Sequence, residues 1–349
     1  MKFTSKPSSV KPPKIVVIGA GTGNSTVLAG LKPWIGNSLT AVVNTFDDGG
    51  GTGKIREEYN GIAVGDMRQC ARAMSDYSQD ALAVLEGRFP EGTGRSGMNL
   101  TGQNPGNILF EQIHQLFADD PQKIVAIISE LFNVRGKVLP ASNDSRRLRI
   151  TLSNGDCIEG EHTADETLTS SFKGAQINFI GGLTTISESA KEAIAAAEMV
   201  IIAPGDLYTS VGPNLVVIGM KEALKKATMV VMVSNLMNRN RHTVGYDVDD
   251  YAQEYERLIG DKVIDYVLYN SQTPERTALL EQALLGSRPV LANHKALARS
   301  GYKPVGKDLL SEKIVIVDPH DAIAENRSRI RHDPQKVALA IKEIYYNQL

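Results

Sequence analysis

The sequence predicts an α/β protein with a Rossmann-like, doubly wound and mainly parallel sheet that carries a small antiparallel hairpin insertion. Continuous apolar runs such as KIVVIG (14–19) and MVII (199–202) are typical of strands buried on both faces of a parallel sheet. Each run leads into a glycine turn. The stretch RLRITL (147–152) alternates instead, and Asn154-Gly155 after it is a strong hairpin signal, so this part predicts the antiparallel insertion.

The first βαβ unit takes up the N-terminal part of the chain. A buried strand over 14–21 precedes a helix for which Asn24 and Ser25 offer good N-cap residue types, and a second buried strand covers 38–46. After the hairpin we expect the βαβ order to return. The other elements are helices within 65–90, 104–133, 186–198 and 333–347, a hairpin over 146–161, and parallel strands over 177–182, 199–202, 228–237, 263–270 and 313–318.

The domain organisation is predicted to be simple. Residues 1–13 are rich in Lys, Pro and Ser and predict a disordered tail. No linker divides the rest, so we expect one α/β domain over 14–349, with the hairpin insertion at about 137–162.

Composition excludes several classes of function. A net charge of −2 and a pI near 6.3 argue against bulk binding of nucleic acid, which needs a basic surface. No run approaches the roughly 18 apolar residues of a membrane span, and the N-terminus lacks an apolar signal-peptide core. Cys70 and Cys157 are too few for a disulfide framework and predict inert thiols in a reducing compartment. We therefore expect a cytoplasmic protein with no nucleic-acid or membrane partner.

The first glycine turn, GAGTGN (19–24), resembles the dinucleotide fingerprint but has Asn24 in place of the third glycine. Glycines let backbone N–H groups approach an anion, and the following helix N-terminus attracts negative charge. The alternative interpretation is a tight strand-to-helix turn without a ligand.

The second turn, DDGGGTGK (47–54), follows the second predicted strand. It is not a Walker A loop, because Asp48 stands where the first glycine is needed and Ile55 replaces the hydroxyl residue. Lys54 is predicted either to contact phosphate or to lie on a solvated helix face. Asp47 and Asp48 are placed to contact ribose hydroxyls or to hold a hydrated Mg²⁺, unless they only form the turn.

Two later strand ends repeat this pattern in APGDLYTSVGPN (203–214) and SNLMNRNRHTVGYD (234–247). Backbone donors, hydroxyls, amides and arginines there suit phosphate or sugar groups. In open α/β sheets, ligands bind outside the carboxyl ends of the strands, so we expect these loops to converge. The predicted ligand-binding residues are Gly19, Gly21, Thr22, Gly23, Asn24, Asp47, Asp48, Gly49, Gly50, Lys54, Arg68, Gly205, Leu207, Tyr208, Thr209, Ser210, Asn214, Asn235 and Arg239.

The blocks GAGTGNSTVLAGL, TFDDGGGTGKIRE, VGDMRQC, PGNILFE, APGDLYTSVGPNLVV, SNLMNRNRHTVGYDVDD and RHDPQKVALAI occur in this order. Together they resemble the family of the bacterial gluconeogenesis factor YvcK, which is homologous to the CofD 2-phospho-L-lactate transferases. The resemblance runs from about Lys14 to the end. It implies a Rossmann-like fold and a nucleotide-type ligand at the strand ends, and it matches Gly65, Asp66 and Arg68 to a GDxR block. Gln103 departs from a histidine that is common in the family, which weakens a catalytic interpretation.

The resemblance implies two functions. The gluconeogenesis-factor branch implies a UDP-sugar-binding regulator that links carbon metabolism to cell-wall synthesis and cell shape and needs no cofactor. The CofD branch implies a Mg²⁺-dependent transferase with a guanylated donor, in which Asp47 and Asp48 hold the metal or act as the catalytic base. An NAD-binding Rossmann protein is a third, weaker hypothesis because the third glycine is missing. A homodimer and the protein partner of a regulator are left open.

Overall fold

The computed structural model describes residues 11–48, 63–90, 100–118, 120–166, 171–239, 242–284, 286–312 and 330–347. Its main element is a seven-stranded sheet with the order β10-β9-β8-β7-β1-β2-β3, in which every neighbouring pair is parallel. The strands are β1 Ile15–Gly19, β2 Leu39–Val43, β3 Lys137–Pro140, β7 Met199–Ile202, β8 Val230–Val233, β9 Tyr266–Asn270 and β10 Lys303–Lys307.

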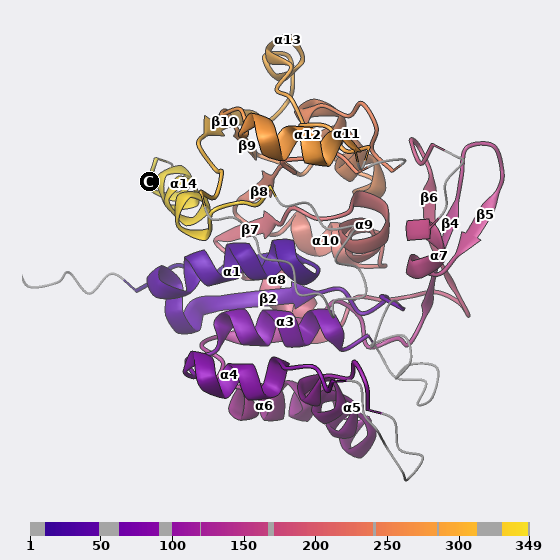
Figure 1. Cartoon of the computed structure of the whole chain (residues 1–349), viewed down its shortest axis with the longest axis vertical. Coiled ribbons are helices and arrows are strands. Elements are labelled where there is room, and N and C mark those ends of the chain that lie inside the picture. Colours follow the sequence, from indigo (N-terminus) through magenta and orange to yellow (C-terminus); the bar gives the residue numbers. More distant parts are fainter. Residues whose placement is uncertain are drawn as a thin grey trace, which may run out of the picture.

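Helices cover both faces of this sheet, as a doubly wound fold requires (Figure 1). Val16 and Ile18 of β1 belong to one apolar core, and Ile15 and Val17 belong to the other. The first core contains residues of α8 Glu188–Ala195, α9 Gly212–Leu215, α10 Met220–Leu224 and α11 Val248–Ile259. The second contains residues of α1 Gly21–Ile35, α3 Gly65–Met74, α5 Pro105–Phe117, α6 Pro121–Leu131 and α14 Pro334–Tyr346.

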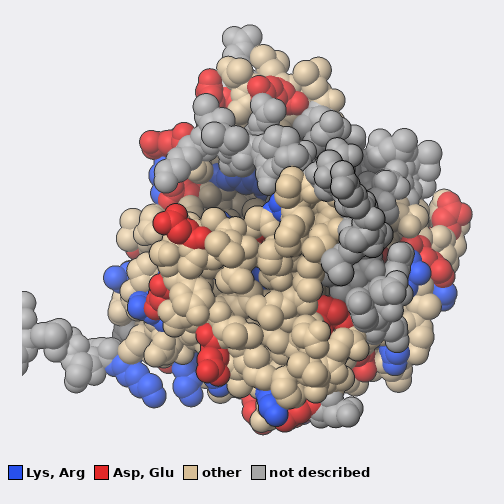
Figure 2. All heavy atoms as spheres, turned by 60° about the horizontal axis from the view of Figure 1, so that its bottom comes forward, with Lys and Arg blue, Asp and Glu red and all other residues tan. Residues whose placement is uncertain are grey.

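The remaining elements are short or lie at the edges of the molecule. They are η1 Gly36–Ser38, α4 Gln79–Glu86, α7 Glu161–Glu166, the π-helical turn η2 Leu207–Val211, α12 Arg276–Leu284 and α13 His294–Leu297. None of the described helices is both long and apolar enough to cross a membrane. In the view of Figure 2, the visible Lys and Arg side chains are interspersed with Asp and Glu.

A second, antiparallel sheet has the order β5-β4-β6 and contains β4 Arg147–Thr151, β5 Cys157–Glu159 and β6 Gln176–Ile180. The predicted hairpin over 146–161 is confirmed. The prediction that INFIGG is a parallel strand was wrong, because β6 pairs with β4. Its residues alternate between buried and exposed at Gln176–Asn178, as expected for a sheet with one solvated face.

The bounds of the insertion also differ from the predicted 137–162, at both ends. Lys137–Pro140 forms β3 at the edge of the parallel sheet, and its last three residues are buried. Therefore the part that leaves the main sheet follows β3 and extends through β6. The strand β10 was not predicted, because Pro304 and Gly306 are poor strand residues that only an edge position tolerates. The strand predicted over 313–318 and residues 1–10 of the predicted tail lie outside the described residues.

Helix α1 begins three residues earlier than its predicted caps. Ala20 is its N-cap residue, and Asn24 is a fully buried residue inside the helix. The closing helix α14 is confirmed, with Asp333 as a cap that accepts from two backbone N–H groups and Pro334 at its first position. Of the two thiols predicted to be buried or inert, Cys70 is buried and Cys157 is exposed.

The order of the strands contains one switch point. From β1 the chain proceeds to β2 and β3 on one side, whereas β7, β8, β9 and β10 follow one another on the other side. The loops that leave β1 and β7 therefore diverge to opposite sides of the sheet. In open α/β sheets such a point opens a crevice at the carboxyl ends of the strands, which is where ligands bind.

Candidate functional site at the switch point

The loops after β1 and β7 are packed closely together. The Ala203 N–H donates to the Ile18 carbonyl oxygen at 2.9 Å. A methyl group on Gly23 would lie 1.7 Å from the Pro204 carbonyl oxygen, and one on Gly19 would lie 3.1 Å from the Ala203 Cβ. At Gly23, the missing side chain lets helix α1 approach the loop after β7. This need for close packing is separate from the predicted approach to phosphate, which stays a prediction.

The end of β2 joins the switch point to the small sheet. The Asn44 N–H donates to the Gly19 carbonyl oxygen at 3.0 Å. Beyond it, Asp48 Oδ2 lies 3.4 Å from Arg147 Nε on β4, and the Phe46 ring packs on Phe179 of β6 with 4.4 Å between centroids. Asp48 therefore has a structural partner, which leaves fewer carboxylate lone pairs for a metal ion than the sequence suggested.

A buried carboxylate, Asp206, organises the loop after β7. It caps η2 by accepting from the Tyr208 and Thr209 N–H groups at 3.1 and 2.9 Å. Its other oxygen lies 3.2 Å from Arg239 Nη1 and 2.7 Å from His242 Nδ1. Burial alone would raise the pKa of Asp206, but the positive charges of His242 and Arg239 hold it well below its ordinary value.

His242 connects this loop to α7, the helix between β5 and β6. Its Nδ1 faces Asp206, and its Nε2 lies 3.1 Å from the carbonyl oxygen of Ala164 on α7. A carboxylate and a carbonyl can only accept, so each ring nitrogen donates a proton and the imidazole is positively charged. Phe172 covers the ring with 4.2 Å between centroids. The buried ion pair thus joins the loop after β7 to the segment after β8, and the hydrogen bond to Ala164 joins that segment to α7.

The predicted hydroxyl ligands of this loop mostly face inwards. Tyr208 is fully buried, and its hydroxyl lies 2.7 Å from Glu254 Oε1 and 2.9 Å from the Tyr246 hydroxyl. Burial and these partners raise its pKa. The expectation that the Tyr208 hydroxyl is presented at the strand ends was therefore wrong, because the π-helical turn directs it into the core. Leu207 is also a core residue, and Ser210 Oγ lies 3.3 Å from Glu161 Oε1.

Asn235 and Arg239 position the loop from the end of β8. Asn235 Oδ1 accepts from the Gly205 N–H at 3.0 Å, and its Nδ2 donates to the Gly205 carbonyl oxygen at 2.7 Å. Both amide atoms thus bind backbone, while Arg239 binds Asp206. The structure brings these two residues to the switch point as predicted, but in supporting roles.

Arg68 of α3 lies in a buried network. Its guanidinium pairs with Glu86 and donates to Asn107 Oδ1 at 2.6 Å. Arg68, which is among the predicted ligand-binding residues, is thus engaged by an acid of its own chain. Gly49, Gly50 and Lys54 lie outside the described residues.

The innermost part of the site contains polar atoms without partners. Asn24, Thr209 and Asn214, all predicted from the sequence, are fully buried, as is Asn44. Each keeps at least one side-chain atom that has no hydrogen-bond partner among the described residues. The sequence reasoning missed Asn44, Asp206 and His242 as site residues. For Asp206 the sequence did contain a signal, because Asp is a preferred residue type at the N-cap position, just before a helical turn begins.

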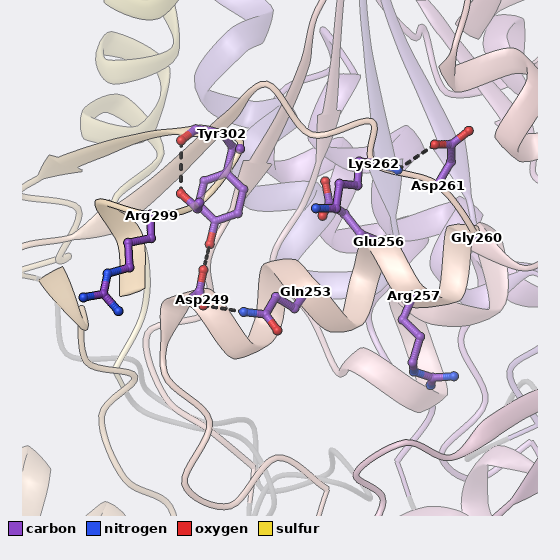
Figure 3. Close-up of a pocket in the computed structure, with 11 residues that line it drawn as sticks. Asp249, Gln253, Glu256, Arg257, Gly260, Asp261, Lys262, Arg299 and Tyr302 are labelled. Atoms are coloured by element: carbon purple, nitrogen blue, oxygen red, sulfur yellow. Dashed lines mark hydrogen bonds between the residues drawn. The ribbon is translucent and has the colours of Figure 1, made fainter. Parts of the chain in front are cut away.

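A separate cavity of about 630 Å³ lies along α11 and the turn before β10. Figure 3 shows Asp249, Gln253 and Tyr302 joined by hydrogen bonds on one of its sides. Its lining residues come from α11, from the turn after it and from Arg299–Tyr302, and none belongs to the loops after β1, β2 or β7. We therefore assign the candidate site to the switch point.

Within the described chain, no three His, Cys, Asp or Glu side chains are grouped to hold a metal ion, and the Mg²⁺ site stays a prediction.

His332 makes stability depend on pH. Although the residue is half-buried, its Nε2 is enclosed, and burial lowers its pKa to about 4, with Arg331 acting in the same direction. The unfolded chain binds a proton near pH 6.5, so stability is lost as the pH falls from 6.5 towards 4. We expect about 2 kcal/mol less stability at pH 5 than at pH 7.5 from this group. Urea unfolding of wild type and of His332→Phe at both pH values measures this loss of stability. If the variant loses as much unfolding free energy between pH 7.5 and pH 5 as wild type does, His332 is not its cause.

Comparisons with known proteins place the chain among relatives. The model of a family described as 2-phospho-L-lactate transferase CofD matches residues 15–310. A gluconeogenesis factor from Halalkalibacterium halodurans is 32% identical over 335 residues, covering 96% of this chain and 97% of that protein. The gluconeogenesis factor of Bacillus subtilis is 30% identical over 338 residues, covering 95% and 98%. A crystal structure of a UPF0052 family member from Bacillus halodurans superimposes with a TM-score of 0.83 at 30% identity, covering 96% of this chain and 100% of that one.

Proposed function

Because this chain belongs to the CofD family and is similar over nearly its whole length to gluconeogenesis factors, we propose that it is a regulatory protein that binds a nucleotide-sugar of the UDP-sugar type at the switch point. In this proposal it links carbon metabolism to cell-wall synthesis and cell shape. Binding, rather than turnover, is its primary activity.

The observation that carries the proposal is the state of the titratable groups at the switch point. A general base needs a pKa near the working pH and a free lone pair. Asp206 is held ionised with a pKa far below neutrality, and both nitrogens of His242 donate to acceptors. These groups hold the loops in place instead of exchanging protons, which supports a binding site over a catalytic one.

A second candidate is a transferase of the 2-phospho-L-lactate type, which the description of the matching family model favours. It requires a metal ion or a base at Asp47 and Asp48. The Arg147 contact of Asp48 fits a metal ligand poorly.

Calorimetry distinguishes the two functions. We expect UDP-N-acetylglucosamine to bind without being consumed, and we expect the binding to persist when Mg²⁺ is removed by a chelator. GDP and NAD serve as competing ligands. Binding of GDP that needs Mg²⁺, together with product from a phospholactyl donor, would instead establish the transferase.

Asp48→Asn tests the role of this carboxylate in the site. We expect weaker ligand binding and a melting temperature within about a degree of wild type, because the contact with the exposed Arg147 is worth well under 1 kcal/mol. Arg147→Gln is the matched control, since it removes the same ion pair but keeps the carboxylate. Equal loss of affinity in both variants would show that Asp48 acts only through Arg147.

A further inference from the structure

Three asparagines contact Gly19 at the end of β1, and one of them also binds the turn η2 that contains Thr209. The Gly19 carbonyl oxygen accepts from the Asn44 N–H at 3.0 Å and lies 3.5 Å from Asn214 Nδ2. The Asn24 side chain lies against the same glycine, 3.3 Å from where its Cβ would be. Thr209 belongs to η2, whose Ser210 carbonyl also accepts from Asn214. These residues, Asn24, Asn44, Thr209 and Asn214, form what we call the amide cluster.

The amide cluster carries unsatisfied hydrogen-bonding atoms. Both amide atoms of Asn24, Asn44 Nδ2, Asn214 Oδ1 and Thr209 Oγ1 are enclosed and have no partner among the described residues. Folded proteins contain few such atoms, and each costs about 1–3 kcal/mol relative to a hydrated group. Their occurrence together at the switch point indicates partners other than the described residues.

The identity of the unsatisfied atoms defines the missing partner. Asn44 Oδ1 accepts from the Phe46 N–H at 3.3 Å, and Asn214 Nδ2 donates to the Ser210 carbonyl oxygen, so neither amide can be turned round. The cluster therefore offers free donors at Asn44 and free acceptors at Asn214, while Asn24 offers one of each in either orientation. A phosphate oxygen only accepts and leaves the acceptors unsatisfied. A hydroxyl both donates and accepts.

We propose that the amide cluster is a subsite that binds sugar hydroxyls of the ligand, whereas the phosphates bind elsewhere in the crevice. The proposal rests on the proposed function and specifies which part of the ligand lies beside β1. The chemistry is shared by a ribose and by a pyranose. Since the cluster is enclosed, the hydroxyls reach it only when a neighbouring loop moves.

Asn24→Leu is the decisive variant, because leucine has a similar volume and no hydrogen-bonding atoms. In the free protein the Asn24 side chain has no hydrogen bond to lose among the described residues, so we expect a melting temperature equal to or above that of wild type. For UDP-N-acetylglucosamine we expect an affinity at least about tenfold lower, because the variant loses one or two hydrogen bonds to the ligand. Pyrophosphate, which has no hydroxyl, should bind both proteins equally.

Asn235→Leu is the matched control, because both atoms of that amide are bound to Gly205. It should lower the melting temperature clearly. UDP and 2′-deoxy-UDP separate the two sources of hydroxyls. If Asn24→Leu weakens UDP but not 2′-deoxy-UDP, the ribose occupies the subsite, and if it weakens only the UDP-sugar, the pyranose does.

An unchanged affinity of Asn24→Leu for the UDP-sugar overturns the subsite. If the melting temperature also falls, the cluster is assigned to enclosed water. This result leaves the proposed function intact, since wild type still binds. Failure of wild type to bind any of these nucleotides overturns the proposed function and the subsite together.

Discussion

Gly23→Ala is expected to destabilise the protein by about 3 kcal/mol or more, at the upper end of what overpacking costs. The added methyl group would lie 1.7 Å from the Pro204 carbonyl oxygen, and the clash is with backbone, which cannot rotate away. Helix α1 must then move from the loop after β7. It also packs against α3 and α14, so the strain extends to one whole face of the sheet.

Urea unfolding measures this effect. Gly301→Ala is the matched control, because a methyl group there meets no atom within 4 Å, and its midpoint should stay near that of wild type. A loss of about 3 kcal/mol is a large part of the 5–15 kcal/mol that stabilises a typical domain. An unchanged midpoint for Gly23→Ala would mean that the loops after β1 and β7 lie further apart than described.

Asp206→Asn is expected to cost about 3–5 kcal/mol, the range observed when one partner of a buried ion pair is removed. The variant leaves the charge of His242 buried without its counter-ion, and the side chain of Arg239 loses the same partner. Since the pKa of Asp206 is lowered in the folded state, its contribution is present above the unfolded value near 3.8 and is lost as the pH falls through and below it. Wild type should therefore lose more stability than the variant below pH 4.

The control for this prediction is Asp261→Asn, which removes an exposed carboxylate paired with Lys225 at 2.7 Å. Its melting temperature should change little, because water screens such a pair. A double variant, Asp206→Asn with His242→Gln, should recover part of the loss, since it removes the stranded charge as well. If Asp206→Asn melts at the wild-type temperature, the buried ion pair does not hold the loop.

The parallel core could be predicted because its signals are local. The runs that form β1, β2, β7, β8 and β9 are mostly apolar, and such runs have few alternatives to a buried strand. The antiparallel hairpin was predictable for the same reason, from alternation and Asn154-Gly155. By contrast, β6 and β10 depend on which strand they meet, and no local pattern in INFI or KPVGK specifies a partner.

The candidate site was predictable in place but not in detail. Strand ends followed by glycine and polar residues indicated the correct edge of the sheet. The direction of a side chain in a π-helical turn is not encoded in its residue type, so Tyr208 was expected at the surface of the site although it binds Glu254 in the core. His242 was missed because its two partners, Asp206 and Ala164, are distant in sequence and meet it only in the folded protein.

The strand order has a consequence for how this protein is made on the ribosome. Strand β1 is synthesised long before β7, yet Ile15 pairs with Met199 of β7 on one side. Until β7 has been synthesised, one edge of an entirely apolar strand has no neighbour, which is a condition that favours association with other chains. Such long-range pairing also slows folding. We therefore expect nascent chains that end before about residue 202 to bind chaperones. Chains that include β7 are expected to be released from these chaperones.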